Sequence, residues 1–371
     1  MNSARTTTEQ KNFSRCPLSP LVRGLPLLGN TRDFLSDTTG FLVGAYRKYG
    51  PIFRIRMLWL KFTVILGYEA REFMQEDGER HLTRHPVFDP VGEQLGSADF
   101  ALAVSGEKHL QLRKLLQVAY SREVASPYVP QFIDAVREVL QEWPVDSAHE
   151  VFEAVQLLAF QQYCRVMGNV SLRAHYRDCR IVTDMNMEVG GRVLPLWMFH
   201  WPPYRAARRR VLKLTTALVG EHRASGASGR APDIIDTLLT LEYPDGRRMT
   251  DDEVVCYALY GFAGSSSYMG RLIAFMLYEI FQHPQLHAQL LEEVDAAFSR
   301  GINDAADLRA LRLLRGVYYE TLRFHPVSQG MPYVAKETFR FNGNEVEEGD
   351  MVVLSQLPML FDEKVFKEPE R

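Results

Sequence analysis

The chain has 371 residues, of which 46% are hydrophobic and 24% are charged, and its formal net charge is −3. This balance is typical of a soluble globular protein with a sizeable core, and it argues against a nucleic-acid partner. No stretch approaches the roughly 18 consecutive apolar residues of a transmembrane helix, so we expect no membrane anchor. Four cysteines without metal-ligand spacing favour a reducing, cytoplasmic location.

The first part of the chain predicts a tail, a helix and two strands. Residues 1–19 are expected to form a disordered tail. Phe41–Tyr49 has the pattern of a short amphipathic helix, and Ile52–Met57 and Phe62–Leu66 alternate as strands do. From residue 106 to about residue 301 the pattern is mostly helical.

The strongest helix is predicted to begin at Thr250. Thr250 and Glu253 have the spacing of a capping box, in which each side chain accepts a hydrogen bond from a backbone N–H at the helix start. The helical pattern continues to His283, just before Pro284. Such a helix would be roughly 50 Å long and would span a whole domain.

In the C-terminal region the hydrophobic pattern changes from a helical period to a strand-like one. A further helix is expected from Leu308 to Phe324, and Val334–Phe341 and Glu345–Ser355 read as strands. Asn342-Gly343 is typical of the tight turn between two strands. The order of elements favours one mainly α domain with a small β region assembled from both ends of the chain.

Two helical segments carry charged side chains at helical spacing. Glu320 and Arg323 lie three residues apart, and His109 and Arg113 lie four apart, so each pair shares a helix face. On local evidence alone, both pairs are better explained as solvated charges than as functional groups.

The long helix contains the segment GFAGSSSYMG, residues 261–270. Its glycines remove side-chain bulk and its serines compete for backbone carbonyls, which predicts a local kink. The residues alone leave two interpretations equally open. One is a buried helix crossed closely by another, and the other is a functional groove.

Taken in order, these segments resemble the cytochrome P450 family of haem-thiolate monooxygenases. YYETLRFHP resembles the K helix of that family, and LFDEKVFKEPER resembles the segment that leads into its PER motif. LPLLGN and YGPIFRIR resemble its entry segment and first strand, and FQHPQLHAQLLEEV resembles its J helix. Each motif is weak alone, but the ordered set is specific. The resemblance implies a single P450-type domain over residues 20–371.

The resemblance also implies roles for the charged pairs. Glu320, Arg323 and Arg371 would form the structural triad that fixes the segment beside the haem. His109 and Arg113 would bind a haem propionate, to which arginine gives a charge-assisted hydrogen bond. The implied cofactor is therefore heme b.

Further implied roles belong to the glycine-serine segment. Ala263, Gly264, Ser266 and Ser267 would line the oxygen site. The family usually has an acid followed by a threonine here, so Ser267 retains a hydroxyl while Ser266 lacks the carboxylate. Tyr333 stands where the family often has another propionate-binding arginine. The first departure puts ordinary dioxygen activation in question, and the second implies that one propionate anchor is lost or moved.

The family's cysteine ligand lies in a loop after the PER motif, and we expect the chain to stop before that loop. Cys16, Cys164, Cys179 and Cys256 are not in such a loop, so thiolate ligation from the expected position is not available. Two explanations remain open. The chain is an incomplete enzyme, which we favour because the haem-facing motifs are retained. Alternatively, it is a haem-free accessory protein that activates a partner such as a glycosyltransferase.

For the complete enzyme we expect oxidation of a small apolar substrate. Its electrons would come from a ferredoxin- or flavodoxin-type partner. His283 and His287 have a metal-ligand spacing but no evident third ligand, so we expect them on the surface and predict no metal site apart from the haem.

Overall fold

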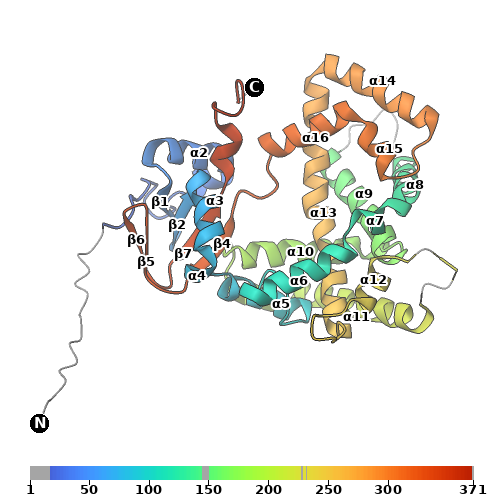
Figure 1. Cartoon of the computed structure of the whole chain (residues 1–371), viewed down its shortest axis with the longest axis horizontal. Coiled ribbons are helices and arrows are strands. Elements are labelled where there is room, and N and C mark those ends of the chain that lie inside the picture. The colour runs from blue at the N-terminus through green and yellow to red at the C-terminus, as the bar shows by residue number, and fades with distance from the viewer. Residues whose placement is uncertain (1–16, 144–149, 227–228, 231, 370–371) are drawn as a thin grey trace, which may run out of the picture. The chain divides into compact units, whose positions relative to one another are not determined.

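The computed structural model describes residues 17–143, 150–226, 229–230 and 232–369 (Figure 1). The chain forms two compact units. One contains the residues up to Thr83 together with Gln329–Pro369, and the other contains Arg84–Ser328. Most of the predicted N-terminal tail lies outside the described residues, and the prediction of a single domain over residues 20–371 stays a prediction.

The first unit combines short helices with a mixed sheet and a hairpin. Its described elements are α1 (Thr31–Ser36), α2 (Thr38–Tyr49), β1 (Ile52–Met57), β2 (Leu60–Leu66), α3 (Gly67–Glu76), α4 (Gly78–His81), β3 (Leu82–Thr83), β4 (Met331–Ala335), β5 (Phe339–Phe341), β6 (Asn344–Val346), β7 (Met351–Ser355) and the 3-10 helix η4 (Leu357–Phe361).

The sheet of this unit has the strand order β1-β2-β7-β4-β3. β2 and β7 are parallel, with Phe62 opposite Met351. Side chains alternate between the two faces of β2. Val64 packs in one buried cluster, and its neighbour Ile65 packs in another. The predicted assembly of a small β region from both ends of the chain is therefore seen in the structure.

The two long strands predicted near the C-terminus are each divided. Residues 334–341 contribute to β4 and β5, and residues 345–355 contribute to β6 and β7. Asn342 and Gly343 adopt the predicted turn, with φ of 45° and 74°. Gly349, at φ 85°, turns the chain again between β6 and β7. This second turn separates the hairpin from the five-stranded sheet, so the prediction of continuous strands was wrong.

The second unit is almost entirely helical. Its described elements are α5 (His85–Leu95), α6 (Gly106–Ala119), α7 (Arg122–Ala125), η1 (Ser126–Tyr128), α8 (Val129–Leu140), α9 (Val151–Gly168), η2 (Arg173–His175), α10 (Tyr176–Gly190), η3 (Leu196–His200), α11 (Pro202–Ser225), α12 (Ile234–Thr240), α13 (Asp251–Gln282), α14 (Pro284–Arg300), α15 (Ala305–Ala310) and α16 (Arg312–Phe324).

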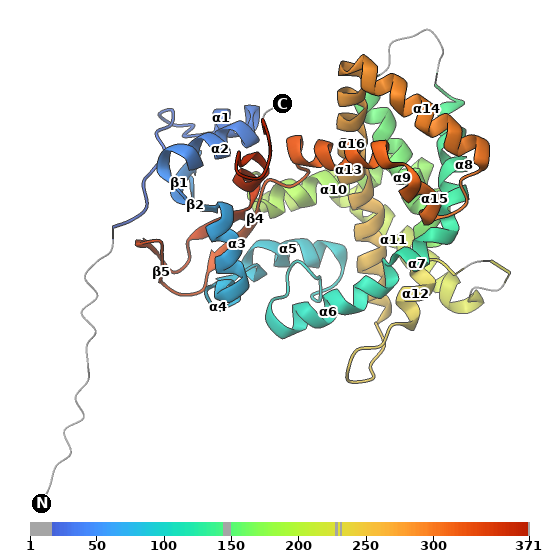
Figure 2. The same ribbon diagram turned by 45° about the horizontal axis from the view of Figure 1, so that its top comes forward.

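Helix α13 runs through this unit and contacts α9, α10 and α11 (Figures 1 and 2). Its 32 residues correspond to about 48 Å. The predicted capping box is present, because Thr250 N donates to Glu253 Oε2 at 2.7 Å and Glu253 N donates to Thr250 Oγ1 at 3.3 Å. The length and the start of the predicted central helix are confirmed.

The helix predicted from Leu308 to Phe324 is interrupted at Leu311, which separates α15 from α16. The carboxylate of Glu293 on α14 accepts hydrogen bonds from the backbone N–H groups of Leu313 and Leu314 at 2.9 and 3.0 Å. These groups have no intrahelical partner at a helix start. A carboxylate from another helix therefore satisfies them, and local sequence could not reveal this.

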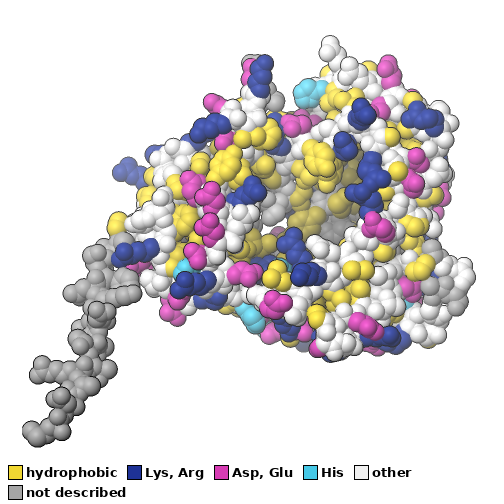
Figure 3. Space-filling model, in the orientation of Figure 1, with side chains coloured by type: hydrophobic (Ala, Val, Ile, Leu, Met, Phe, Trp, Pro, Cys, Tyr) yellow, Lys and Arg dark blue, Asp and Glu magenta, His cyan; other side chains and the backbone are white. Residues whose placement is uncertain are grey.

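Acidic and basic side chains are intermixed with apolar ones over the face of the molecule seen in Figure 3. This mixture agrees with the small net charge of −3. In the described part of the chain, no helix is both long enough and apolar enough to cross a lipid bilayer.

Candidate functional site

The glycines of α13 divide between two roles. A Cβ atom added at Gly261 would meet Tyr163 Cε1 at 2.7 Å, and one added at Gly270 would meet Gln156 Cα at 2.8 Å, both on α9. A Cβ at Gly264 would meet nothing within 4 Å. Gly261 and Gly270 therefore permit the close crossing of α9 and α13. Gly264 faces open space.

That open space is a cavity of about 380 Å³ beside α13. A smaller hollow of about 20 Å³ shares several wall residues with it and adds Thr183 and Asn186 from α10. Among the described residues, neither wall contains an acidic, lysine, arginine or histidine side chain. Residues that line both hollows are Phe100, Leu102, Tyr260, Gly264 and Tyr268.

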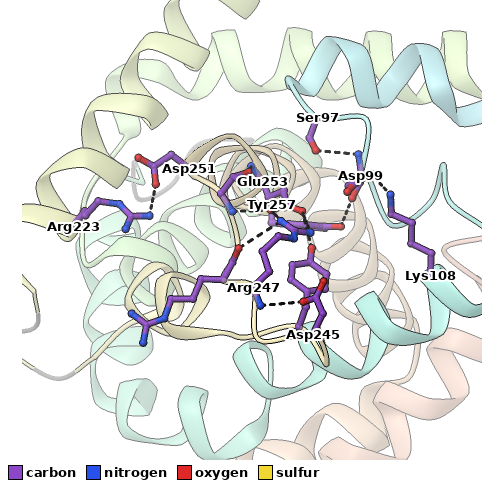
Figure 4. Close-up of polar contacts among 12 residues, drawn as sticks. Ser97, Asp99, Lys108, Arg223, Asp245, Arg247, Asp251, Glu253 and Tyr257 are labelled. Carbon is purple, nitrogen blue, oxygen red and sulfur yellow. Dashed lines mark hydrogen bonds and ion pairs between the residues drawn. The ribbon is translucent and has the colours of Figure 1, made fainter.

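Hydrogen bonds hold the loop before α6 against α13. The hydroxyl of Tyr257 donates to the carbonyl oxygen of Asp99 at 2.7 Å, and Asp99 N donates to Ser97 Oγ at 3.1 Å (Figure 4). The Asp99 carboxylate also pairs with Lys108 on α6. Because this loop supplies Phe100 to the cavity wall, these contacts determine the position of that wall.

The start of α13 is fixed by an ionised carboxylate. Arg247 Nη1 lies 2.8 Å from Glu253 Oε2 (Figure 4). The hydroxyl of Tyr243 donates to Glu253 Oε1 at 2.7 Å. Burial by itself would raise the pKa of Glu253, but the hydrogen bonds from Arg247, Thr250 and Tyr243 outweigh it and lower this pKa. The negative charge also suits the positive end of the helix dipole.

The residues predicted for the oxygen site lie within five positions of one another on α13 but do not share one environment. Gly264 lines the cavity. Ser266 and Ser267 are buried, with 1% and 8% of their surface exposed, and neither lines the two hollows. Ala263 lies in the same helix, but its side chain is outside the described part of the structure. Their catalytic roles stay predictions.

The predicted propionate ligands lie on α6. A ring nitrogen of His109, Nδ1, donates to the carbonyl oxygen of Ala101 at 2.9 Å. Arg113 is exposed, and it makes no hydrogen bond or ion pair with any residue that the structure describes. Its guanidinium is therefore available to an anion. Tyr333 lies on β4 in the first unit, where it packs against a buried cluster.

The predicted structural pair on α16 is formed. Arg323 Nε and Nη2 donate to Glu320 Oε2 at 3.0 and 2.7 Å. The arginine side chain is 7% exposed, whereas that of the glutamate is 55% exposed. Local sequence favoured a solvated pair, and the burial of Arg323 contradicts that interpretation. Arg371, the third member predicted by resemblance, lies outside the described residues.

Three cysteines, Cys164, Cys179 and Cys256, are described, and all are free and buried. Burial raises the pKa of Cys179 and of Cys256 to about 12 and raises the pKa of Cys164 well above its ordinary value. All three are thus neutral thiols near pH 7. None of the three lines the cavity beside Gly264. Cys16 lies outside the described residues.

A separate polar cluster joins α11 to the start of α12. His222, Asp233 and Asp236 bring ligand-type atoms within 4.8 Å of one another. However, Arg230 Nη1 lies 2.7 Å from Asp233 Oδ2 and 2.6 Å from Asp236 Oδ2, and His222 Nε2 lies 2.9 Å from Asp233 Oδ2. The guanidinium and the imidazole already neutralise the carboxylates, so the cluster is a salt-bridge network.

Comparison with known proteins identifies the class of fold. A family model described as Cytochrome P450 matches residues 19–371. The chain therefore belongs to the cytochrome P450 family, whose members are haem-dependent monooxygenases. This result confirms the resemblance found in the sequence and the predicted mainly α fold with a long central helix.

Named relatives share low identity over most of the chain. Lanosterol 14-alpha demethylase of Bos taurus is 24% identical over 346 residues, which cover 90% of this chain and 68% of the relative. Cytochrome P450 85A1 of Oryza sativa subsp. japonica is 22% identical over 363 residues, which cover 95% and 76%.

Solved structures give the same fold. Retinoic acid-bound cyanobacterial CYP120A1 superposes with a TM-score of 0.76 at 19% identity, over 96% of this chain and 81% of that one. The heme domain of cytochrome P450DA superposes with a TM-score of 0.77 at 17% identity, over 96% and 81%. Similarity at this level of identity establishes the fold and leaves the substrate open.

Proposed function

We propose that the chain is the P450 part of a monooxygenase that oxidises a small apolar substrate held in the cavity beside Gly264. The observation that carries this proposal is the uncharged cavity itself. Its volume of about 380 Å³ lies within the range of small-molecule sites. Gly264 leaves the helix backbone open to it, because no atom lies within 4 Å of a Cβ at this position.

The cofactor would be heme b, which supplies the oxygen-activating chemistry when it is bound. The residues on α6 fit a propionate group, because Arg113 is an exposed cation without an ion pair to a described residue. His109 would assist it. Ser267 would provide a hydroxyl at the oxygen site, while Ser266 offers no carboxylate. The buried Arg323 and its partner Glu320 would hold the scaffold.

We propose that none of Cys164, Cys179 and Cys256 binds the iron, because none of these buried side chains lines the cavity beside Gly264. By resemblance, electrons would come from a ferredoxin- or flavodoxin-type partner in the cytoplasm.

Titration of the 371-residue protein with hemin tests the propionate assignment. Arg113→Gln should weaken hemin binding about tenfold, because it removes a charge-assisted hydrogen bond. Lys114→Gln, which removes a neighbouring exposed charge on the same helix, should leave binding unchanged. Equal affinities of the two variants would contradict the role of Arg113.

The spectrum of the reduced protein under carbon monoxide tests the cysteine assignment. We expect no red-shifted Soret band of the thiolate type from Cys164, Cys179 or Cys256. If that band appears, and if it disappears in a variant with these three cysteines replaced by serine, the assignment is wrong.

A further inference from the structure

Tyrosine side chains form much of the wall of the 380 Å³ cavity. Most of their hydroxyl groups already have a partner. Tyr257 donates to a loop carbonyl at 2.7 Å, and Tyr268 donates to a methionine sulfur at 3.4 Å. Tyr120 is hydrogen-bonded with Tyr163 and also lies 3.5 Å from a carbonyl oxygen of α13. The hydroxyl groups of these tyrosines are already engaged and are poorly placed to donate a hydrogen bond to a ligand.

Tyr260 differs from them. Within the described residues its hydroxyl has no hydrogen-bond partner, and the side chain lines both hollows. Its ring meets Phe100 edge-on, with centroids 5.0 Å apart, so its position is fixed. Burial raises the pKa of Tyr260, which keeps the phenol neutral and able to donate. It lies one helical turn before Gly264.

Asn186 on α10 supplies a second donor to the smaller hollow. The residue is 6% exposed, and its Oδ1 accepts a hydrogen bond from the hydroxyl of Tyr204 at 2.9 Å. Its Nδ2 has no partner among the residues that the structure describes. Two donors from different helices therefore line one hollow. Neither donor atom is among the fully buried side-chain atoms that lack a partner in the described residues, so each is accessible from open space and can donate to a ligand oxygen.

The chemistry of the wall selects the ligand. A charged substrate would be buried without a counter-charge, because no ionised side chain of the described chain lines either hollow. The aromatic rings favour a flat, ring-bearing molecule. A carbonyl oxygen has two lone pairs and can accept from two donors at once. Building on the proposed function, we propose that Tyr260 and Asn186 together hold the carbonyl oxygen of a neutral, ring-bearing, otherwise apolar substrate.

Three matched probes test this proposal by equilibrium dialysis against the 371-residue protein. They are 2-acetylnaphthalene, its hydrocarbon counterpart 2-ethylnaphthalene, and the charged 2-naphthoate. We expect the ketone to bind about two- to tenfold more tightly than the hydrocarbon, which corresponds to one ordinary hydrogen bond. The carboxylate should bind most weakly.

A variant pair assigns the effect to one hydroxyl. Tyr260→Phe should lower ketone affinity about two- to tenfold and leave hydrocarbon affinity unchanged. Tyr268→Phe is the control, because it removes a phenol from the same wall whose hydroxyl already contacts a sulfur atom. Circular dichroism of each variant checks that it is folded.

These binding measurements distinguish the carbonyl assignment from the proposal that the cavity beside Gly264 is the substrate site. Equal binding of ketone and hydrocarbon by the unaltered protein would overturn the carbonyl assignment while the cavity remained the substrate site. Stronger binding of the carboxylate would overturn the neutral class. If no probe binds, both the carbonyl assignment and the proposed substrate cavity are wrong.

Discussion

Gly264 and Gly270 lie on the same helix, α13, but on faces with opposite requirements. At Gly270 the backbone of α9 is so close that a Cβ would lie 2.8 Å from Gln156 Cα. At Gly264 an added Cβ would meet no atom of the other described residues within 4 Å. One face is thus packed against a neighbouring helix and the other borders a cavity. Glycine permits tight helix packing at position 270 and leaves the helix backbone open to the cavity at position 264. Substitutions at the two positions can distinguish these roles.

The largest effect is expected for Gly270→Ala. The added methyl group would press on the backbone of α9, which cannot move aside as a side chain can. Overpacking of this kind costs about 1–3 kcal/mol. Urea denaturation should show a lower free energy of unfolding. If Gly270→Ala were as stable as the unaltered protein, the face of α13 at Gly270 would not be tightly packed against α9.

Gly261→Ala should be destabilising by a smaller amount, about 1 kcal/mol. The new methyl group would meet the flexible end of Met167 and the ring edge of Tyr163 rather than backbone atoms. Both contacts are with side-chain atoms, which can move aside more easily than a backbone. Denaturation under the same conditions should place this variant between Gly270→Ala and the unaltered protein.

Tyr257→Phe tests how the cavity face is held. It removes the 2.7 Å hydrogen bond to the carbonyl oxygen of Asp99, which we expect to cost about 1 kcal/mol. The loop that carries Phe100 should also exchange its amide hydrogens faster. If the amide hydrogens of this loop exchange no faster in the variant than in the unaltered protein, the loop is held by other contacts.

Of these variants, Gly264→Ala should change the free energy of unfolding least, and it should raise this free energy where the others lower it. Alanine favours the helix by about 0.5–1 kcal/mol over glycine, and the methyl group meets no atom. The variant should nonetheless bind 2-ethylnaphthalene more weakly, since the methyl group occupies cavity volume. Gly220→Ala on α11, also in open space, is the control for helix propensity, and it should not change ligand binding. A destabilised Gly264→Ala would contradict the assignment of this face to a cavity.

Local patterns predicted the elements that local contacts determine. Thr250 and Glu253 were sufficient to place the start of α13, because both partners of the capping box lie within one turn. The interruption at Leu311 was missed, since it depends on Glu293 from another helix. In the same way, residues 334–341 alternate as one strand, but β4 pairs with β7 in the five-stranded sheet while β5 pairs with the adjacent β6 in a separate hairpin.

The candidate site was only partly predictable. The resemblance led to Gly264, His109, Arg113 and the Glu320–Arg323 pair. The cavity tyrosines were missed, although Tyr257, Tyr260 and Gly264 share a helix face by their spacing. That spacing is equally typical of an ordinary core stripe. Tertiary contacts leave the hydroxyl of Tyr260 without a partner among the described residues, and such contacts are not visible in sequence.

The parallel pairing of β2 with β7 has a consequence for how the protein is made. These strands are neighbours in the sheet but are separated by most of the chain, including the whole second unit. At ~5–20 residues per second of synthesis, β1 and β2 wait on the order of ten seconds or more for β7. The helical unit, which is continuous in sequence, can meanwhile bury its core. During that interval the edge of β2 that later pairs with β7 is an unpaired template for other strands.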